Sequence, residues 1–194
     1  MIVIFGAAGS GKSTQGRILA DKLGWKWLSV GQVLRDSGKF AKTLKNGELV
    51  DDDEVIKLMN REIERADAEG MNVILDGYPR DAYQAEYIKN NMADKVELAI
   101  ILKVPVEELW GRIERRGRED DTKEVVERRF GVFWDNIDKI LEKFGGITEV
   151  VEIDGMGEFE EVTERLMGMI KEKIVDATEL EEKMGEGREM SYGE

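Results

Sequence analysis

The stretch GAAGSGKSTQ occupies residues 6–15 and directly follows the apolar run MIVIF. It matches the pattern GxxxxGK[ST], in which glycines allow backbone N–H groups to turn inward around phosphate oxygens. In such a loop Lys12 reaches the β- and γ-phosphates of a nucleoside triphosphate, and the hydroxyl of Ser13 or Thr14 lies close to Mg²⁺. The other loop residues expected at the phosphates are Gly9, Ser10 and Gly11. The stretch therefore predicts a P-loop between a strand and a helix, and the positive dipole at the start of that helix favours phosphate.

The order of apolar runs along the chain predicts the fold class. Short apolar runs bounded by Gly or Asp lie at residues 2–5, 25–29, 71–76, 98–104 and 149–153. Helical patterns separate them, at residues 12–23, 31–45, 53–68, 81–91, 106–116, 122–144 and 157–175. This alternation is typical of βαβ units. We expect an α/β three-layer sandwich of the P-loop NTPase type with a five-stranded parallel sheet, in one domain over residues 1–175, followed by a polar tail at 176–194.

Composition excludes several kinds of chemistry. The 194 residues include no Cys and no His, which rules out disulfides, thiol nucleophiles, imidazole acid–base catalysis and Cys/His zinc sites. The net charge of −13 argues against nucleic acid as a partner. No apolar run approaches the length that spans a membrane, and the P-loop begins at Gly6, so we expect a cytoplasmic protein without a membrane partner.

A second phosphate site is indicated by DGYPR at residues 76–80. It follows an apolar run, at the end of a strand where open parallel sheets bind ligands. Arg80, directly after Pro79, presents a planar fork suited to phosphate oxygens, and Asp76 could orient water bound to Mg²⁺. The alternative is an ordinary turn with a surface arginine, and by itself Arg35 reads as a solvated helix residue.

Arginines are concentrated in residues 112–129. They are Arg112, Arg115, Arg116, Arg118, Arg128 and Arg129. Acidic residues alternate with them, so a salt-bridged helical surface is the alternative to a phosphate site. Helical spacing puts Arg112 and Arg116 on one face and turns Arg115 aside.

These stretches together carry a family resemblance. GAAGSGKSTQ is followed, in this order, by LSVGQVLR at residues 28–35, DGYPRDAYQAE at 76–86, RRGREDD at 115–121 and EIDGMGEFEEV at 152–162. Over residues 1–172 the chain resembles the adenylate kinase family of nucleoside monophosphate kinases. The resemblance implies reversible phosphoryl transfer from MgATP to a nucleoside monophosphate, with AMP the expected acceptor and Mg²⁺ the cofactor.

For the acceptor, the resemblance implies that Arg35 and Arg80 grip the monophosphate and that Gln84 hydrogen-bonds its base. It places Val30, Gly31, Val50 and Gly77 at the same site. Residues 31–68 match the mobile helical segment that binds the monophosphate. Glycines at positions 31, 38 and 47 punctuate this region, as a hinged segment requires.

For the donor, the resemblance matches Arg112 with the residue that stacks on the ATP adenine and Gly157 with a backbone turn that touches the base. Arg116, Arg118 and Arg129 match the residues that close on the transferred phosphoryl group, whereas Arg115 and Arg128 have no match and are expected to be surface residues. Asp120 and Asp121 match an acidic pair that tethers the closed lid. Residues 112–129 form a short lid, because only Gly117 separates Arg116 from Arg118. With Lys12 and Arg80, the three lid arginines make up the expected catalytic set.

One departure from the family bears on specificity. The family usually has Thr-Gly-Asp where this chain has Val30-Gly31-Gln32, and valine offers no side-chain hydrogen bond to a base. Relaxed nucleobase selectivity is one reading, and recognition of AMP through backbone groups and Gln84 is the other. A UMP/CMP kinase of the same fold and an inactive nucleotide-binding regulatory module are the competing functions. The resemblance also allows a homo-oligomer, such as the trimer of some archaeal members.

Overall fold

The protein is built around a five-stranded parallel sheet. The computed structural model describes residues 1–46, 48, 50–117 and 121–174. In the order β2-β3-β1-β4-β5, the strands are Lys26–Ser29, Val73–Asp76, Ile2–Phe5, Leu98–Lys103 and Val150–Asp154. Every neighbouring pair is parallel, so all five carboxyl ends lie at one edge of the sheet. The predicted α/β fold is confirmed.

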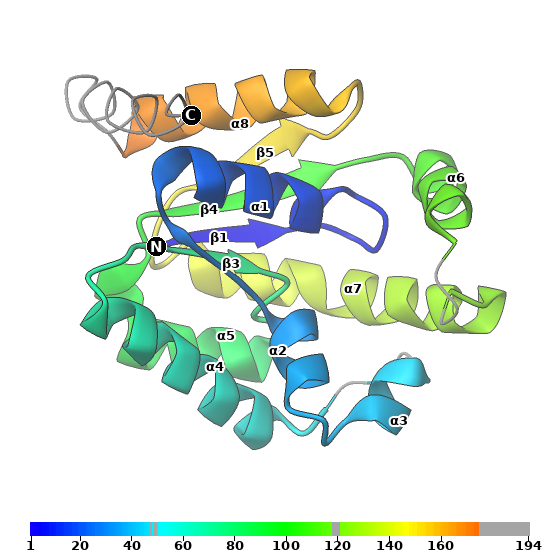
Figure 1. Ribbon diagram of the computed structural model, residues 1–194, viewed down its shortest axis with the longest axis horizontal. Helices are drawn as coiled ribbons and strands as arrows, with labels where there is room; N and C mark the ends of the chain where they lie inside the picture. The colour runs from blue at the N-terminus through cyan, green and yellow to red at the C-terminus, as the bar shows by residue number, and fades with distance from the viewer. Residues whose placement is uncertain (47, 49, 118–120, 175–194) are drawn as a thin grey trace, which may run out of the picture.

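Helices cover both faces of the sheet (Figure 1). α1 (Lys12–Leu23) and α8 (Phe159–Lys173) lie on one face. α4 (Asp52–Ala68), α5 (Ala82–Asn91) and α7 (Lys123–Phe144) lie on the other. The result is the three-layer sandwich expected from the alternating pattern.

The strand β1 shows why its sequence is apolar throughout. Successive side chains of a strand point to opposite faces. Ile2 and Ile4 pack in the cluster under α1 and α8, whereas Val3 and Phe5 pack in the cluster under α4, α5 and α7. Each of these side chains is at most 3% exposed, so both faces of the strand are core. This burial rigidly holds the start of the P-loop.

Most element bounds agree with the prediction within about two residues, but the helix expected at 31–45 is wrong. It consists of two helices, α2 (Val30–Asp36) and α3 (Ala41–Lys45). The chain breaks at Gly38, whose φ of +69° lies in the left-handed region that glycine tolerates best. The last helix also begins later than expected, at Phe159, because Glu158 and Glu161 form a capping box there. A short 3₁₀ turn, Ala93–Lys95, was not predicted.

A third apolar cluster supports the region of the expected lid. α6 (Val106–Arg116) packs through Leu109 and Ile113 against Val126 and Phe130 of α7 and against Ala7 of the P-loop. The arginines at the end of α6 are thereby held beside the phosphate loop. None of the helices in the described part of the chain combines the length and apolar character needed to cross a bilayer.

Candidate active site

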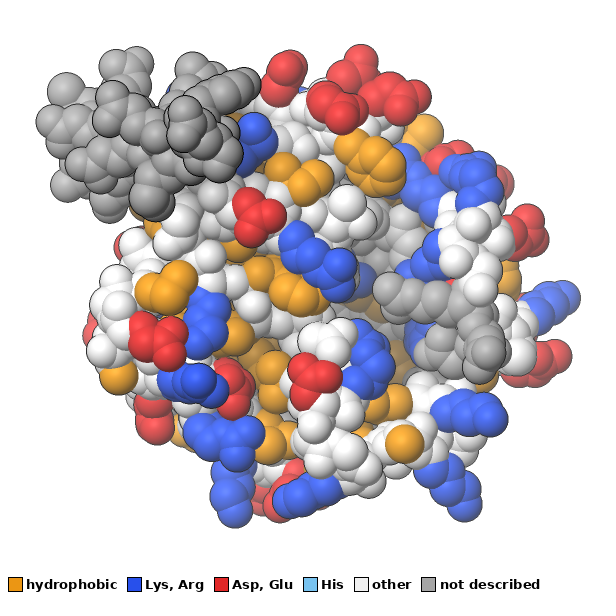
Figure 2. All heavy atoms as spheres, viewed as in Figure 1, with side chains coloured by type: hydrophobic (Ala, Val, Ile, Leu, Met, Phe, Trp, Pro, Cys, Tyr) orange, Lys and Arg blue, Asp and Glu red, His pale blue; other side chains and the backbone are white. Residues whose placement is uncertain are grey.

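A large cavity opens at the carboxyl ends of the strands, as expected for an open parallel sheet. Its volume is about 1080 Å³, and the P-loop, the Asp76–Arg80 turn and residues of α2, α3, α6 and α7 line it. Figure 2 shows basic side chains above and below a hollow on this face of the molecule. The local basic lining contrasts with the strongly acidic chain as a whole. The cavity therefore suits anionic groups.

The P-loop has the backbone that its glycines predict. Gly9 and Gly11 have φ values of +84° and +91°. A Cβ at Gly9 would lie 2.8 Å from the backbone oxygen of Leu109, so α6 approaches the loop too closely for a side chain at this position. Lys12 Nζ donates a hydrogen bond to the backbone oxygen of Ala7 at 3.3 Å. The expected phosphate-binding residues Gly9, Ser10, Gly11, Lys12, Ser13 and Thr14 all line the cavity.

On the donor side, Arg112 reaches from α6 across the P-loop. Its Nε pairs with Glu108 Oε1 at 2.8 Å, and its Nη2 donates to the backbone oxygen of Gly155 at 3.0 Å. Gly157, with φ +106°, lies in the same loop before α8. Arg112 and Gly157 both line the cavity, so the structure brings together the two residues expected at the donor base.

On the acceptor side, two arginines converge near Gly31. A Cβ built there would lie 3.4 Å from Arg35 Nη1 and 3.5 Å from Arg80 Nη2. Arg80 Nε donates to the backbone oxygen of Gly77 at 3.1 Å, which orients the guanidinium. Burial and the charges of Arg129 and Arg35 lower the pKa of Arg80, and the charge of Asp76 opposes this. Converging cations of this kind are stabilised by an anion placed between them.

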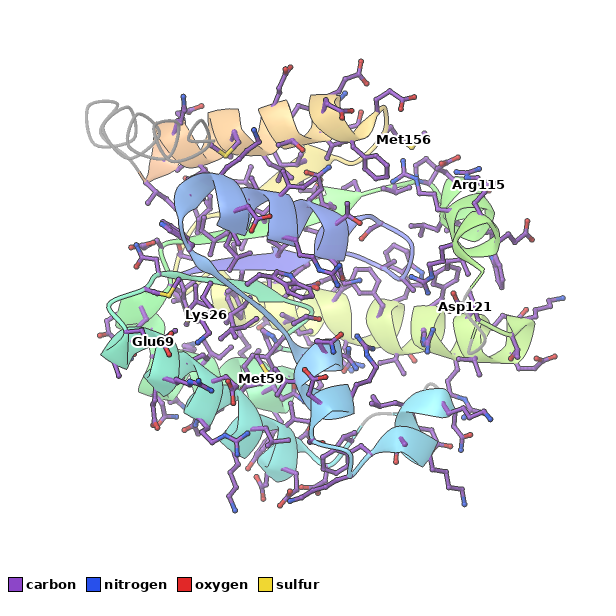
Figure 3. All side chains as sticks on the ribbon, in the orientation of Figure 1. Lys26, Met59, Glu69, Arg115, Asp121 and Met156 are labelled. Atoms are coloured by element: carbon purple, nitrogen blue, oxygen red, sulfur yellow. The ribbon has the colours of Figure 1, made fainter. Side chains whose placement is uncertain are left out.

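Asp121 forms ion pairs with two of the three expected lid arginines, Arg116 and Arg129. It lies between the end of α6 and the start of α7 (Figure 3), and its side chain is 4% exposed. Arg116 donates to it from Nε at 2.6 Å and from Nη2 at 2.8 Å, and Arg129 donates from Nη1 at 2.8 Å. Arg118 and Asp120 fall outside the described residues.

Three residues expected at the acceptor lie in the core. Val30 is 0% exposed, Val50 is 7% exposed and Gln84 is 1% exposed. Gln84 Oε1 accepts from the backbone N–H of Arg80 at 2.9 Å, and Gln84 Nε2 donates to Asp52 Oδ1 at 2.7 Å. Gln84 therefore supports the backbone of Arg80, and its contact with a base stays a prediction.

Several known proteins are similar to this chain over most of its length. The family model described as adenylate kinase matches residues 4–148. An adenylate kinase of Stenotrophomonas maltophilia is 34% identical over 185 residues, which cover 88% of this chain and 98% of the relative. One from Maricaulis maris is 34% identical over 187 residues, covering 89% and 99%. "Adenylate kinase 2" of Nostoc is 34% identical over 166 residues, covering 79% and 89%. The chain belongs to the adenylate kinase family.

Membership in the adenylate kinase family makes this protein a phosphotransferase acting on nucleotides, as the P-loop and the DGYPR turn predicted. Family members work with Mg²⁺-bound ATP, and the residues present fit that ion. Asp76 is 2% exposed, and its Oδ2 has no hydrogen-bond partner within the described ranges. Among the described residues no group of three or more acidic side chains is placed to hold a metal ion, so phosphate oxygens and water would have to complete the shell around Asp76 and Ser13.

Two residues make contacts near this site that were not predicted from the sequence. Asp52, the first residue of α4, holds Gln84. Arg128, expected to be a surface residue, is exposed but donates from α7 to Asn46 O at 3.0 Å and Glu48 Oε1 at 3.1 Å. Neither contact has a local sequence signal, since the partners are more than thirty and about eighty positions apart.

Asp81, the N-cap of α5, makes the folding stability of the protein depend on pH. Burial and a hydrogen bond and charge from Asp52 raise the pKa of Asp81 to about 6. Between about pH 4 and pH 6 the folded state then binds more protons than the unfolded chain, so stability falls as pH rises through this window and is level above it.

We expect Asp81→Asn to remove this fall. Asparagine still accepts the cap hydrogen bond from the Gln84 N–H and is never charged. Urea unfolding should show the variant about 1 kcal/mol more stable than wild type at pH 8 and close to wild type at pH 4.5. An equal difference at both pH values would contradict the assignment to Asp81.

Proposed function

We propose that the protein catalyses reversible phosphoryl transfer from MgATP to AMP, giving two ADP. The observation that carries the proposal is the meeting of two phosphate-binding groups in one cavity. The P-loop follows β1 and the Asp76–Arg80 turn follows β3, and these strands are hydrogen-bonded neighbours. A donor triphosphate on Lys12 and an acceptor phosphate on Arg35 and Arg80 would therefore face each other.

The available side chains suit this chemistry. A nucleoside monophosphate is already mostly a dianion near neutral pH, because its second pKa is about 6. Its oxygen can attack the γ-phosphorus of ATP without a general base, so a chain without His or Cys lacks nothing it needs. The remaining difficulty is to align two polyanions and to stabilise the charge on the transferred group in a loose transition state.

We assign these tasks to named residues. Lys12 and the P-loop N–H groups hold the donor phosphates, and Arg35 and Arg80 hold the acceptor phosphate. Arg116, Arg118 and Arg129 neutralise the transferred phosphoryl group, and Asp121 orients two of them. Asp76 and Ser13 would hold Mg²⁺, which would neutralise charge on the donor phosphates.

We further propose that residues 31–68 and 112–129 move to exclude water when both nucleotides are bound. Gly38 and Gly117, with φ values of +69° and +57°, provide places where the backbone can turn. Cytoplasmic location and a homo-oligomer remain part of the proposal.

Two residues of α2, Val30 and Gln32, bear on the choice of acceptor base. Val30 is buried, and Gln32 is occupied, because its Oε1 accepts from Arg35 at 3.0 Å and its Nε2 donates to Asp36 at 2.7 Å. Neither side chain is thus set to read a base. This favours relaxed base selectivity over strict selection of AMP.

Initial rates of ADP formation from ATP with AMP, CMP, UMP or GMP test the function and the selectivity. We expect AMP to be accepted best, with a preference in kcat/KM of less than about a thousandfold over the other monophosphates. A larger preference contradicts relaxed selectivity, and faster reaction with UMP and CMP favours the UMP/CMP kinase. Tight ATP binding without monophosphate-dependent turnover points to the regulatory module.

A further inference from the structure

The loop between β5 and α8 is held by arginines from two different helices. Arg165 of α8 donates from Nη1 to the backbone oxygens of Asp154 at 2.8 Å and Met156 at 2.6 Å. Arg112 of α6 donates from Nη2 to the backbone oxygen between them, that of Gly155, at 3.0 Å. The backbone oxygens of three successive residues thus accept hydrogen bonds from guanidinium groups. The outer two accept from Arg165 and the middle one from Arg112.

The same loop is fixed by its own side chains. Asp154 Oδ1 accepts from the N–H of Met156 at 3.0 Å, and Glu161 Oε2 accepts from the N–H of Glu158 at 2.9 Å. A Cβ at Gly157 would lie 2.2 Å from Glu161 Oε2 and 3.4 Å from Arg165 Nη2. The loop is therefore packed around a glycine, and Arg165 is part of that packing.

The loop forms one wall of the nucleotide cavity. Gly155, Gly157 and Phe159 line the cavity together with Arg112, and the Phe159 side chain is 59% exposed. Figure 3 shows Met156 on the side of α6 away from Asp121, and its sulfur lies 4.0 Å from Arg112 Nη2. An aromatic ring and a guanidinium beside a rigid backbone turn suit a flat heteroaromatic base.

We propose that Arg165 is a positioning residue for the base of the donor nucleotide. This inference rests on the proposed function, because it takes the triphosphate on the P-loop as the donor. Arg165 itself bonds to the loop carbonyls, so it would act on the base through the loop. By holding the carbonyls of Asp154 and Met156, it keeps Gly157 and Phe159 where the base meets them and lets Arg112 keep its bond to Gly155.

Equilibrium binding measured by calorimetry tests this role without requiring turnover. We expect Arg165→Ala to raise the Kd of ATP about tenfold, because two charge-assisted hydrogen bonds to the loop are lost. The Kd of inorganic tripolyphosphate should change less than about twofold, since that ligand has phosphates for the P-loop but no base. Arg165→Lys keeps a cation that can reach the carbonyls and should recover most of the ATP affinity.

Lys171→Ala is the matched control, because it removes one exposed cation from the same helix. It should leave both Kd values near those of wild type. Unchanged ATP affinity in Arg165→Ala, or equal weakening of ATP and tripolyphosphate, would overturn the proposal. If the alanine variant does not fold, Arg165→Gln replaces it and the same two ligands are compared.

Activity separates this inference from the proposed function. Wild-type enzyme without AMP-dependent ADP formation contradicts the function, and the ATP and tripolyphosphate titrations still report on Arg165. If wild type is active and Arg165→Ala leaves the ratio of the Kd of ATP to the Kd of tripolyphosphate unchanged, only the positioning role is contradicted.

Discussion

Replacing Arg80 with alanine should lower kcat/KM for AMP by about a thousandfold. Arg80 is expected to meet the acceptor phosphate before and during transfer, so its loss weakens AMP binding and the alignment of the attacking oxygen. Its guanidinium is held by the Gly77 carbonyl and lies near that of Arg35. Steady-state rates at varied AMP and saturating ATP provide the measurement.

Two further variants make the Arg80 test specific. Arg80→Lys keeps the charge but loses the planar fork. We expect its kcat/KM for AMP to exceed that of Arg80→Ala by less than about tenfold. Arg61→Ala removes an arginine of α4 whose side chain is 69% exposed, and it should behave as wild type. A drop of less than tenfold in Arg80→Ala would show that another group grips the acceptor.

Asp121→Ala is expected to have the second largest effect. It removes the carboxylate shared by Arg116 and Arg129, whose side chains are 28% and 24% exposed. Two partly buried guanidinium groups would then repel each other without this partner. We expect kcat to fall about a hundredfold, because both arginines lose their orientation toward the transferred phosphoryl group. The unfolding free energy should fall by about 2 kcal/mol, less than for a fully buried pair.

The control for Asp121 is Asp138→Ala, which removes an exposed carboxylate from α7, the helix that follows Asp121. It should leave kcat and stability close to wild type. Thermal unfolding followed by circular dichroism and ADP formation give the two readouts. Loss of stability with normal kcat would limit Asp121 to a structural role.

Much of the fold could be read from local patterns. The P-loop, the first helix and the strand β1 have the bounds that the sequence predicts, because a short apolar run and the glycines that follow it are local signals. The prediction of one helix at 31–45 was wrong at Gly38. The helical sequence pattern continues across this residue, but its backbone adopts a left-handed conformation. Propensity alone cannot tell a tolerated glycine from a break.

The candidate site was predictable as a set of residue types, not as a set of contacts. Lys12, Arg80 and the lid arginines stand in recognisable motifs, and the structure describes Lys12, Arg80, Arg116 and Arg129 around one cavity. The sequence did not predict that Asp121 pairs with both Arg116 and Arg129, that Gln84 bonds to Asp52, or that Arg165 holds the loop carbonyls.

By itself, the sequence determined the sheet, the phosphate loop and the class of chemistry, since these depend on patterns within about twenty residues of chain. Only the tertiary structure decided which side chains line the cavity and which partners they bond. Val30 and Gln84 belong to matching motifs and are buried, and Gln84 bonds to Asp52 and to the backbone of Arg80, whereas Arg165 belongs to no motif and holds the carbonyls of the β5–α8 loop. The reason is physical: orientation and hydrogen-bond partners depend on packing between elements far apart in the chain, which local propensity does not encode.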